Sequence, residues 1–183
     1  ALAEKLGVPL VIMEPIKGGS LATLPKDIDA IFKSQDENAS TASWALRWVA
    51  SHSNCKVILS GMSTFEQLED NLKTFNREDV NLDDQEMATV AKVREAINAR
   101  MKNGCTGCAY CMPCPFGINI PKNFAIWNRE AMYGDTVKAK NDYATLNEAQ
   151  AALCKKCGKC EKVCPQALPI REDLVRVAKD LGE

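Results

Sequence analysis

Cys105-Thr-Gly-Cys-Ala-Tyr-Cys-Met-Pro-Cys-Pro115 is the stretch that decides the fold, together with Cys154-Lys-Lys-Cys-Gly-Lys-Cys-Glu-Lys-Val-Cys-Pro165. Eight of the nine cysteines fall in these two runs, which read C-x2-C-x2-C-x2-C-Pro and C-x2-C-x2-C-x3-C-Pro. This spacing is typical of a domain with two [4Fe–4S] clusters, in which the fourth cysteine of each run ligates the cluster of the other run. The runs therefore predict one-electron chemistry.

The spacing also predicts which thiolates share a cluster. We expect one cluster on Cys105, Cys108, Cys111 and Cys164, and the other on Cys154, Cys157, Cys160 and Cys114. The first run departs from the common pattern, because only two residues separate Cys111 from Cys114. Gly104, Gly107 and Gly158 are able to adopt the positive φ that loops wrapping a cluster often require. Pro115 and Pro165 fix the backbone after each fourth cysteine.

Three other readings of the cysteines are less consistent with the pattern. Structural zinc also takes four cysteines, but its ligands usually come as separated C-x2-C pairs. A disulfide framework fits poorly, because the cysteines lie two or three residues apart and their total is odd. Thioredoxin-like chemistry needs a single C-x2-C at the start of a helix beside a strand, which neither run offers.

The composition indicates which partners to exclude and which cellular compartment to expect. The net charge of −1 gives no basic field for nucleic acid and no polybasic tail for a membrane. No apolar run reaches the ~18 residues of a membrane span. Reduced thiolates remain available to iron in a reducing compartment, so we expect a cytoplasmic protein without nucleic-acid or membrane partners.

The first hundred residues have an α/β pattern. Residues 8–13 and 56–59 are apolar, β-branched runs that predict two buried parallel strands. Between them, Ser40 or Thr41 is expected to cap a helix with Trp44, Ala45, Trp48 and Val49 on one face. Ser63 with Glu66, and Asp83 with Glu86, are expected to form capping boxes. The two helices that follow would carry two apolar stripes: Phe65, Leu68, Leu72 and Phe75; then Met87, Val90, Ile97 and Met101.

Two parallel strands do not make a self-sufficient sheet, because parallel sheets need several strands covered on both faces. We therefore expect residues 1–101 to be the C-terminal part of a larger α/β domain. A small α+β domain with one odd edge strand is the alternative.

Three stretches carry a family resemblance: Val8-Pro-Leu-Val-Ile-Met-Glu-Pro-Ile-Lys-Gly-Gly-Ser-Leu21, Ala45-Leu-Arg-Trp48, and Val57-Ile-Leu-Ser-Gly-Met-Ser-Thr-Phe-Glu-Gln-Leu-Glu-Asp-Asn-Leu72. They resemble the seventh strand, seventh helix, eighth strand and cofactor-side helix of aldo/keto reductases. The cysteine region is similar to a two-cluster domain that one branch of that family carries. The resemblance implies the last two βα units of a (β/α)8 TIM barrel in residues 1–101, followed by a helical ferredoxin-like 2[4Fe–4S] domain in residues 102–183.

The same resemblance implies a nicotinamide dinucleotide site at the C-terminal ends of the two strands. Gly18, Gly19, Ser20 and Leu21 would lie near the pyrophosphate, and Gly61, Ser63, Gln67 and Asn71 would surround the adenosine end. Many relatives place Lys and Arg where this sequence has Gly61 and Gln67, and Glu66 would repel a 2′-phosphate. NAD, NADP or neither therefore remains open for the full-length protein.

No catalytic residue is assigned, because the family's catalytic Asp, Tyr, Lys and His come from early strands that this sequence does not contain. His52 is expected to be a surface residue at a helix end, and Cys55 a buried small hydrophobe in a strand. The cysteine runs and the family resemblance together favour an iron–sulfur oxidoreductase in which the clusters pass electrons to or from a barrel site with a small-molecule substrate. The alternative is a non-catalytic electron-transfer or docking module.

The cluster region itself predicts helices from Pro121 to about Gly134, from about Thr136 to Leu153, and from Ile170 onward. We expect Trp127 in the core and a stripe of Leu174, Val175, Ala178 and Leu181 on the last helix. Lys155, Lys156, Lys159 and Lys162 crowd the second run. They would raise the cluster's reduction potential and attract an acidic carrier such as a ferredoxin or flavodoxin, or they are simply a solvated face.

Overall fold

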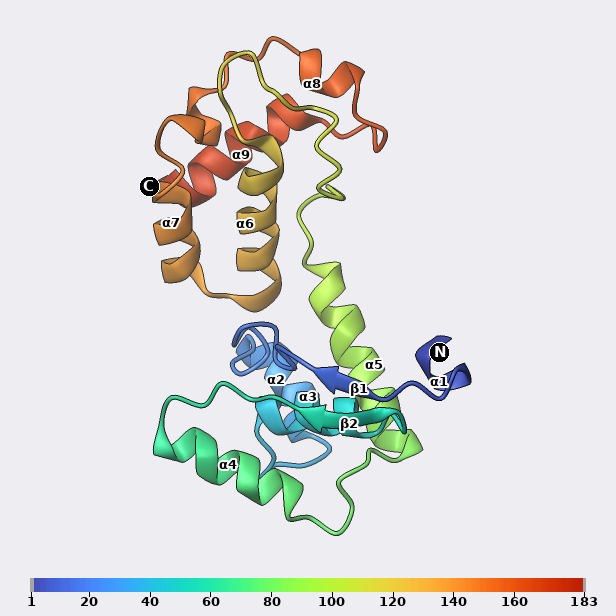
Figure 1. Ribbon diagram of the computed structural model, residues 1–183. Helices are drawn as coiled ribbons and strands as arrows, with labels where there is room; N and C mark the ends of the chain where they lie inside the picture. Colours follow the sequence, from blue (N-terminus) through green and yellow to red (C-terminus); the bar gives the residue numbers. More distant parts are fainter. Residues whose placement is uncertain (1, 183) are drawn as a thin grey trace. The chain divides into compact units, whose positions relative to one another are not determined.

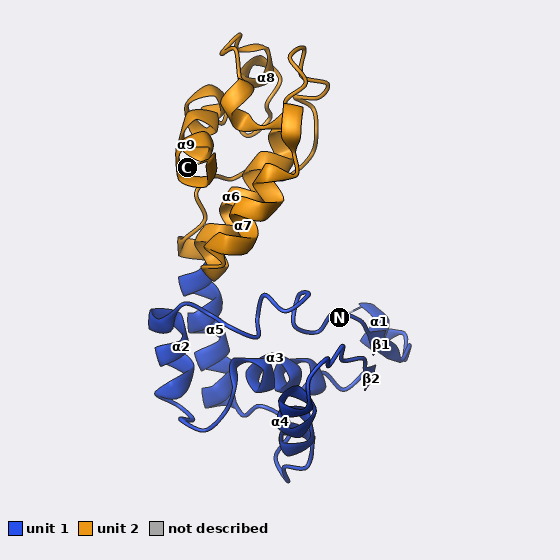
Figure 2. Ribbon diagram, turned by 90° about the vertical axis from the view of Figure 1, so that its left-hand side faces the viewer, with its two compact units in different colours: residues 1–97 blue, residues 98–183 orange. Residues whose placement is uncertain are grey.

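The computed structural model describes residues 2–182 and divides into two compact units, residues 1–97 and 98–183 (Figure 2). The first unit contains α1 (Leu2–Lys5), β1 (Leu10–Ile12), α2 (Lys26–Lys33), α3 (Thr41–Ala50), β2 (Cys55–Ile58) and α4 (Phe65–Phe75). Helix α5 (Asp84–Ala99) follows (Figure 1). The second unit contains α6 (Ile120–Tyr133), α7 (Thr136–Ala144), two 3-10 turns (Asn147–Ala149 and Ala151–Leu153), α8 (Lys159–Lys162) and α9 (Ile170–Gly182).

Strands β1 and β2 form a parallel pair, as predicted, with Val11 opposite Val57 and Ile12 opposite Ile58. Strand β1 is shorter than the predicted strand at residues 8–13, whereas β2 is as long as the predicted strand at residues 56–59 but begins and ends one residue earlier. Because parallel strands end at the same edge of a sheet, the segments after Ile12 and after Ile58 leave from one edge. These segments hold the residues expected around a dinucleotide.

Much of the apolar surface of this unit is exposed. The predicted apolar residues of α4 do line up along the helix, but none is buried, and Phe65 is 70% exposed. Val11 and Val57 of the sheet are likewise 60% and 45% exposed. Parallel sheets normally have both faces covered. Within the described residues, this sheet and α4 lack such a cover on their apolar side chains.

The core of the first unit is built by α2, α3 and α5 instead. Helix α2 was not predicted, although Ile28 and Phe32 lie one turn apart after Pro25 and are both buried. The rings of Phe32 and Trp44 stack with centroids 4.8 Å apart. On α5 the buried face is Glu86, Thr89, Val93 and Ile97, so the predicted stripe is wrong for Met87 and Met101, which are exposed.

Two of the three predicted helix N-caps are confirmed by the structure. The Ser40 hydroxyl accepts a hydrogen bond from the Ser43 amide at the start of α3. Asp83 and Glu86 form a reciprocal capping box, with amide-to-carboxylate distances of 2.7 and 3.0 Å. At α4 the cap is Thr64 rather than Ser63, because the Thr64 hydroxyl accepts from the Gln67 amide.

A buried ion pair ties α3 to α5. The guanidinium of Arg47, which is fully buried, binds both carboxylate oxygens of Glu86 at 2.7 and 2.8 Å. It also donates to the carbonyls of Asp79 and Val80. Bidentate geometry with further acceptors is what allows a charged pair to be buried.

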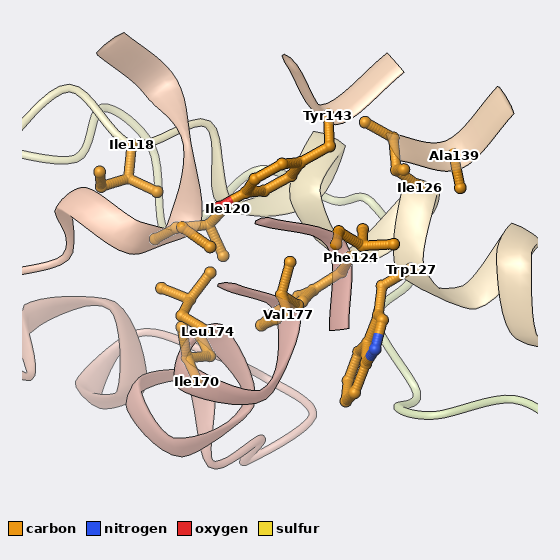
Figure 3. Packing of buried hydrophobic residues seen from close by; sticks show 12 residues of the cluster. Ile118, Ile120, Phe124, Ile126, Trp127, Ala139, Tyr143, Ile170, Leu174 and Val177 are labelled. Carbon is orange, nitrogen blue, oxygen red and sulfur yellow. The ribbon is translucent and has the colours of Figure 1, made fainter. Parts of the chain in front are cut away.

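In the second unit α6, α7 and α9 pack around one hydrophobic core (Figure 3). Trp127 is fully buried in it, as predicted, and its Nε1 donates to Asp180 at 2.7 Å. The buried residues of α9 are Ile170, Leu174, Val177 and Leu181 at helical spacing, together with Asp173. Val175 was predicted on this face but is 47% exposed.

The connection between α6 and the second cysteine run differs from the prediction. Helix α6 ends at Gly134 in the left-handed conformation, as expected of a helix-ending glycine. The next helix, however, stops at Ala144 rather than at Leu153. Asn147 adopts φ 48°, which ends the helical path, and the chain continues in two 3-10 turns.

In residues 2–182, no helix is both long and apolar enough to span a membrane.

Candidate metal centre

The two cysteine runs share one backbone conformation. In each run the residues before and after the second cysteine have positive φ: Gly107 and Ala109 in the first, Lys156 and Gly158 in the second. This conformation turns the backbone around the thiols. Only two of these four residues are glycines, so the sequence alone did not show the equivalence.

The equivalence continues after the fourth cysteine of each run. The Gly117 amide donates to the Cys114 carbonyl at 3.0 Å, and the Ala167 amide donates to the Cys164 carbonyl at 3.1 Å. Both Gly117 and Ala167 have positive φ. Each turn leads into a helix whose first residue is an isoleucine six positions after the cysteine. Residues 114–120 (CPFGINI) and 164–170 (CPQALPI) therefore form an internal repeat, which comparison of the two tails would have revealed.

Two cavities lie between the runs. The first, of about 210 Å³, is lined by Cys154, Cys157 and Cys160 of the second run and by Cys111 and Cys114 of the first. The second, of about 20 Å³, is lined by four cysteines: Cys105, Cys108, Cys111 and Cys164. Each cavity thus groups three cysteines of one run with the last cysteine of the other, and Cys111 borders both.

Cysteine exposure repeats between the runs as well. The second cysteine of each run, Cys108 or Cys157, is exposed, and the other six are partly buried. All nine cysteines, Cys55 included, are free thiols. Among residues 2–182, no three Cys, His, Asp or Glu side chains are arranged to hold a single metal ion. The donor set of both cavities is all cysteine, which is the set that [4Fe–4S] clusters use.

Two of the thiols have raised pKa values. Burial raises the pKa of Cys111, and the charges of Cys105, Cys108 and Cys164 act in the same direction. Burial likewise raises the pKa of Cys160 to about 11, with Glu161 and Cys154 adding to the effect. These thiols are protonated near neutral pH in the metal-free chain, so metal binding must release their protons.

Two asparagines of α6 fix the backbone that enters the runs. Asn123 is fully buried; its Nδ2 donates to the Ala149 carbonyl and its Oδ1 accepts from the Ala151 amide, both at 2.9 Å. Asn128 accepts from the amides of Lys102 and Asn103 at 3.0 and 3.1 Å. One helix therefore positions the segments before Cys105 and before Cys154. Neither asparagine was predicted, since an asparagine within a helix carries no signal of this role.

Charge is distributed unequally around the two runs. Residues 103–121 contain no Lys, Arg, Asp or Glu, whereas residues 154–164 contain four lysines and one glutamate. All four lysines are exposed, and Lys155, Lys156 and Lys159 line the first cavity. Arg171 lines it as well.

The residues expected around a dinucleotide lie after β1 and β2. Gly18, Gly19, Gly61, Ser63 and Gln67 are exposed, and the rest of that set (Ser20, Leu21 and Asn71) are partly buried. Two of these side chains are engaged within the chain. The Gln67 Oε1 accepts from the Ser63 backbone amide at 2.8 Å, and the Asn71 Nδ2 donates to the Ser60 hydroxyl at 2.9 Å.

His52 and Cys55 lie close to where the sequence placed them. His52 is exposed just after α3, with its Nδ1 2.8 Å from the Trp48 carbonyl. Its prediction as a helix-end surface residue is confirmed. Cys55 begins β2 but is only partly buried.

Comparison with known families explains the two units. Residues 1–95, more than half of the chain, match the model described as "Aldo/keto reductase family". The chain belongs to the aldo/keto reductase family. Residues 104–168 match the model described as "4Fe-4S dicluster domain". This aldo/keto reductase family member is therefore an iron–sulfur protein of an oxidoreductase type. No curated protein and no solved structure matches the chain.

Proposed function

We propose that this chain is the C-terminal part of an iron–sulfur oxidoreductase that passes single electrons through two [4Fe–4S] clusters to or from an aldo/keto-reductase-like barrel. One cluster would be held by Cys105, Cys108, Cys111 and Cys164, and the other by Cys154, Cys157, Cys160 and Cys114. The observation that carries the proposal is the pair of cavities, each lined by three cysteines of one run and the last of the other.

The residues around the cavities fit this role. When bound, the clusters supply one-electron redox chemistry. Ile120 and Phe124 line the second cavity, and Ile118 and Leu174 line the first; all four are buried and keep water from the inner side. Cys108 and Cys157 are exposed, so each site has an edge close to the surface across which an electron is able to pass.

Reconstitution of the chain with iron and sulfide under anaerobic conditions tests this proposal. We expect about eight irons and eight inorganic sulfides per chain, with a brown absorbance that dithionite bleaches. A colourless protein that holds about two zinc ions and no sulfide would overturn it, since zinc is not redox-active.

The barrel part of the proposal rests on the first unit. A parallel β1–β2 pair with exposed apolar side chains is the arrangement expected of two βα units taken from a larger barrel. In the full-length protein, we expect calorimetry to detect binding of NADH or NADPH at the C-terminal ends of these strands.

One observation favours the alternative of a non-catalytic electron-transfer or docking module. Gln67 and Asn71, two of the residues expected around the adenosine, already bind Ser63 and Ser60. If the full-length protein binds neither dinucleotide, the oxidoreductase proposal fails and the module alternative holds.

A further inference from the structure

The surface around the first cavity is strongly positive. Four lysines, Lys155, Lys156, Lys159 and Lys162, follow the cysteines of the second run within eight positions, and we call them the lysine rim. None of their ammonium groups has a hydrogen-bond or ion-pair partner among residues 2–182. Four unpaired like charges so close together repel one another and gain from an anionic partner.

The one acidic residue of this segment does not offset the rim. The carboxylate of Glu161 is bound by Arg171, with Oε2 2.8 Å from both Nε and Nη2 of the guanidinium. The pair is neutral as a whole, so the positive charge of the four lysines is left uncompensated by their own segment.

Exposed apolar side chains border the same cavity. Tyr110 is 69% exposed, Val163 51% and Phe116 47%, and all three line the first cavity beside Lys155, Lys156 and Lys159. Apolar side chains beside unpaired charges form the kind of surface that weak, transient protein complexes use. Burial of the apolar side chains holds the two proteins together, and the charges orient the partner.

We propose that the lysine rim with Tyr110, Phe116 and Val163 is the docking surface for an acidic one-electron carrier protein. This deepens the proposed function and rests on it, because the docked carrier needs a cluster in the first cavity. Charge complementarity selects the partner, because the four lysines of the rim favour an acidic protein. Residues 103–121, which supply Tyr110 and Phe116, contain no charged residue and therefore add apolar contact only.

The electron count of the exchange is simple. The reduced carrier loses one electron and is oxidised; the chain gains that electron at the site lined by Cys157 and is reduced by one. No proton or atom is transferred. The reverse exchange with an oxidised carrier uses the same surface.

The experiment compares two triple variants of the reconstituted chain. K155Q/K159Q/K162Q removes three rim charges and leaves Lys156, whose φ is positive, in place. K122Q/K138Q/K179Q removes three exposed lysines of the same unit that do not line the first cavity. Stopped-flow absorbance at low and high salt measures the reduction of each by a reduced acidic flavodoxin and by an uncharged deazaflavin radical.

We expect the rim variant to be reduced by flavodoxin about tenfold more slowly at low salt, with a much weaker salt dependence, since electrostatic steering raises association rates by about 10 to 1,000 times. The control variant should change less than about twofold with either reductant. With the uncharged radical, the rim variant should slow much less than with flavodoxin and without dependence on salt, because this reaction reports only a change in the cluster's potential. Equal slowing of both triple variants, equal slowing with both reductants, or no slowing at all would overturn the docking surface.

The failure of the underlying function has a different signature. If the unaltered chain assembles no dithionite-reducible clusters, the proposed function fails, and the docking proposal falls with it. If clusters form and accept electrons from the uncharged radical, while flavodoxin reduces the rim variant as fast as the unaltered chain, only the docking proposal is overturned.

Discussion

Glu161 caps the helix that begins at Ile170 by binding the backbone and the side chain of Arg171 together. Its Oε1 accepts from the Arg171 amide and its Oε2 from the Arg171 Nε, each at 2.8 Å. Glu161 directly follows Cys160, and the guanidinium of Arg171 lies against Gly158. This one carboxylate therefore fastens the second cysteine run to the first turn of α9.

Replacing this carboxylate should loosen the second run. E161A leaves the Arg171 amide without its acceptor, and we expect a loss of about 1 kcal/mol in the free energy of unfolding. It should also speed the release of iron to a chelator, which absorbance follows. E172A, which removes an exposed carboxylate from the same helical turn, is the control and should change neither quantity. Equal iron release from both variants would show that the link to α9 is unimportant.

Asn123 should matter more than an exposed asparagine. N123A leaves the buried Ala151 amide without its acceptor, whereas the Ala149 carbonyl still accepts from the Asn119 amide. At about 1–3 kcal/mol for a buried group left unpaired, we expect about 2 kcal/mol less stability by urea unfolding. N141A, at an exposed position of α7, should cost less than about 0.5 kcal/mol. If the two variants are equally stable, Asn123 does not fix the segment before Cys154.

The loop of the first run allows a test of its backbone conformation. Gly107 has φ 72°, where a side chain is strained, whereas Gly104 has no such φ; a Cβ at either would meet nothing within 4 Å. We expect G107A to cost about 1 kcal/mol and to reduce the iron retained after gel filtration, and G104A to retain the unaltered amount. Equal retention by the two variants would contradict the conformation described for the run.

Asp36 should make the first unit less stable in acid. Burial raises the pKa of Asp36, but hydrogen bonds from the Asn38 amide, Arg77 and the Ala39 amide outweigh it and hold the pKa below its usual range. A lowered folded-state pKa gives stability that is present above the unfolded pKa of about 3.9 and is lost as pH falls through the folded value.

Hydrogen exchange at the Ala39 amide measures this effect. Protection should fall between pH 5 and pH 3 beyond the intrinsic pH dependence of exchange, and D36A, which removes the acceptor of both amides, should have low protection at both values. Protection that is unchanged by D36A would show that Asp36 contributes nothing to this segment.

Sequence pattern predicted those parts whose cause is local. The Asp83–Glu86 capping box, the αL end of α6 at Gly134 and the parallel strands each follow from a few neighbouring residues. The exposed face of α4 did not follow, because periodicity defines a stripe without saying what covers it. Whether that stripe is buried depends on which other elements pack against the helix.

The same distinction between local and distant causes holds for the residues of the candidate site. The cysteines proposed as cluster ligands could be predicted from the sequence, because cluster chemistry fixes their spacing. The sequence did not predict the roles of Asn123, Asn128 and Glu161, because their hydrogen-bond partners lie 10 to 28 positions away in the sequence. Ala109 and Lys156 have the positive φ that their counterparts Gly158 and Gly107 have, but an alanine or a lysine carries no sequence signal of it.

The exchange of fourth ligands between the runs is the central claim, and one set of variants tests it. C105S/C108S/C111S removes three ligands of one cluster and keeps Cys114, so about four irons should remain per chain. Iron and sulfide analysis, with the electron paramagnetic resonance spectrum of the reduced protein, then follows the remaining cluster. Adding C114S should abolish or convert it, whereas adding C164S should leave it intact. The opposite result, loss with C164S and retention with C114S, would mean that each run holds its own cluster and would contradict the exchange.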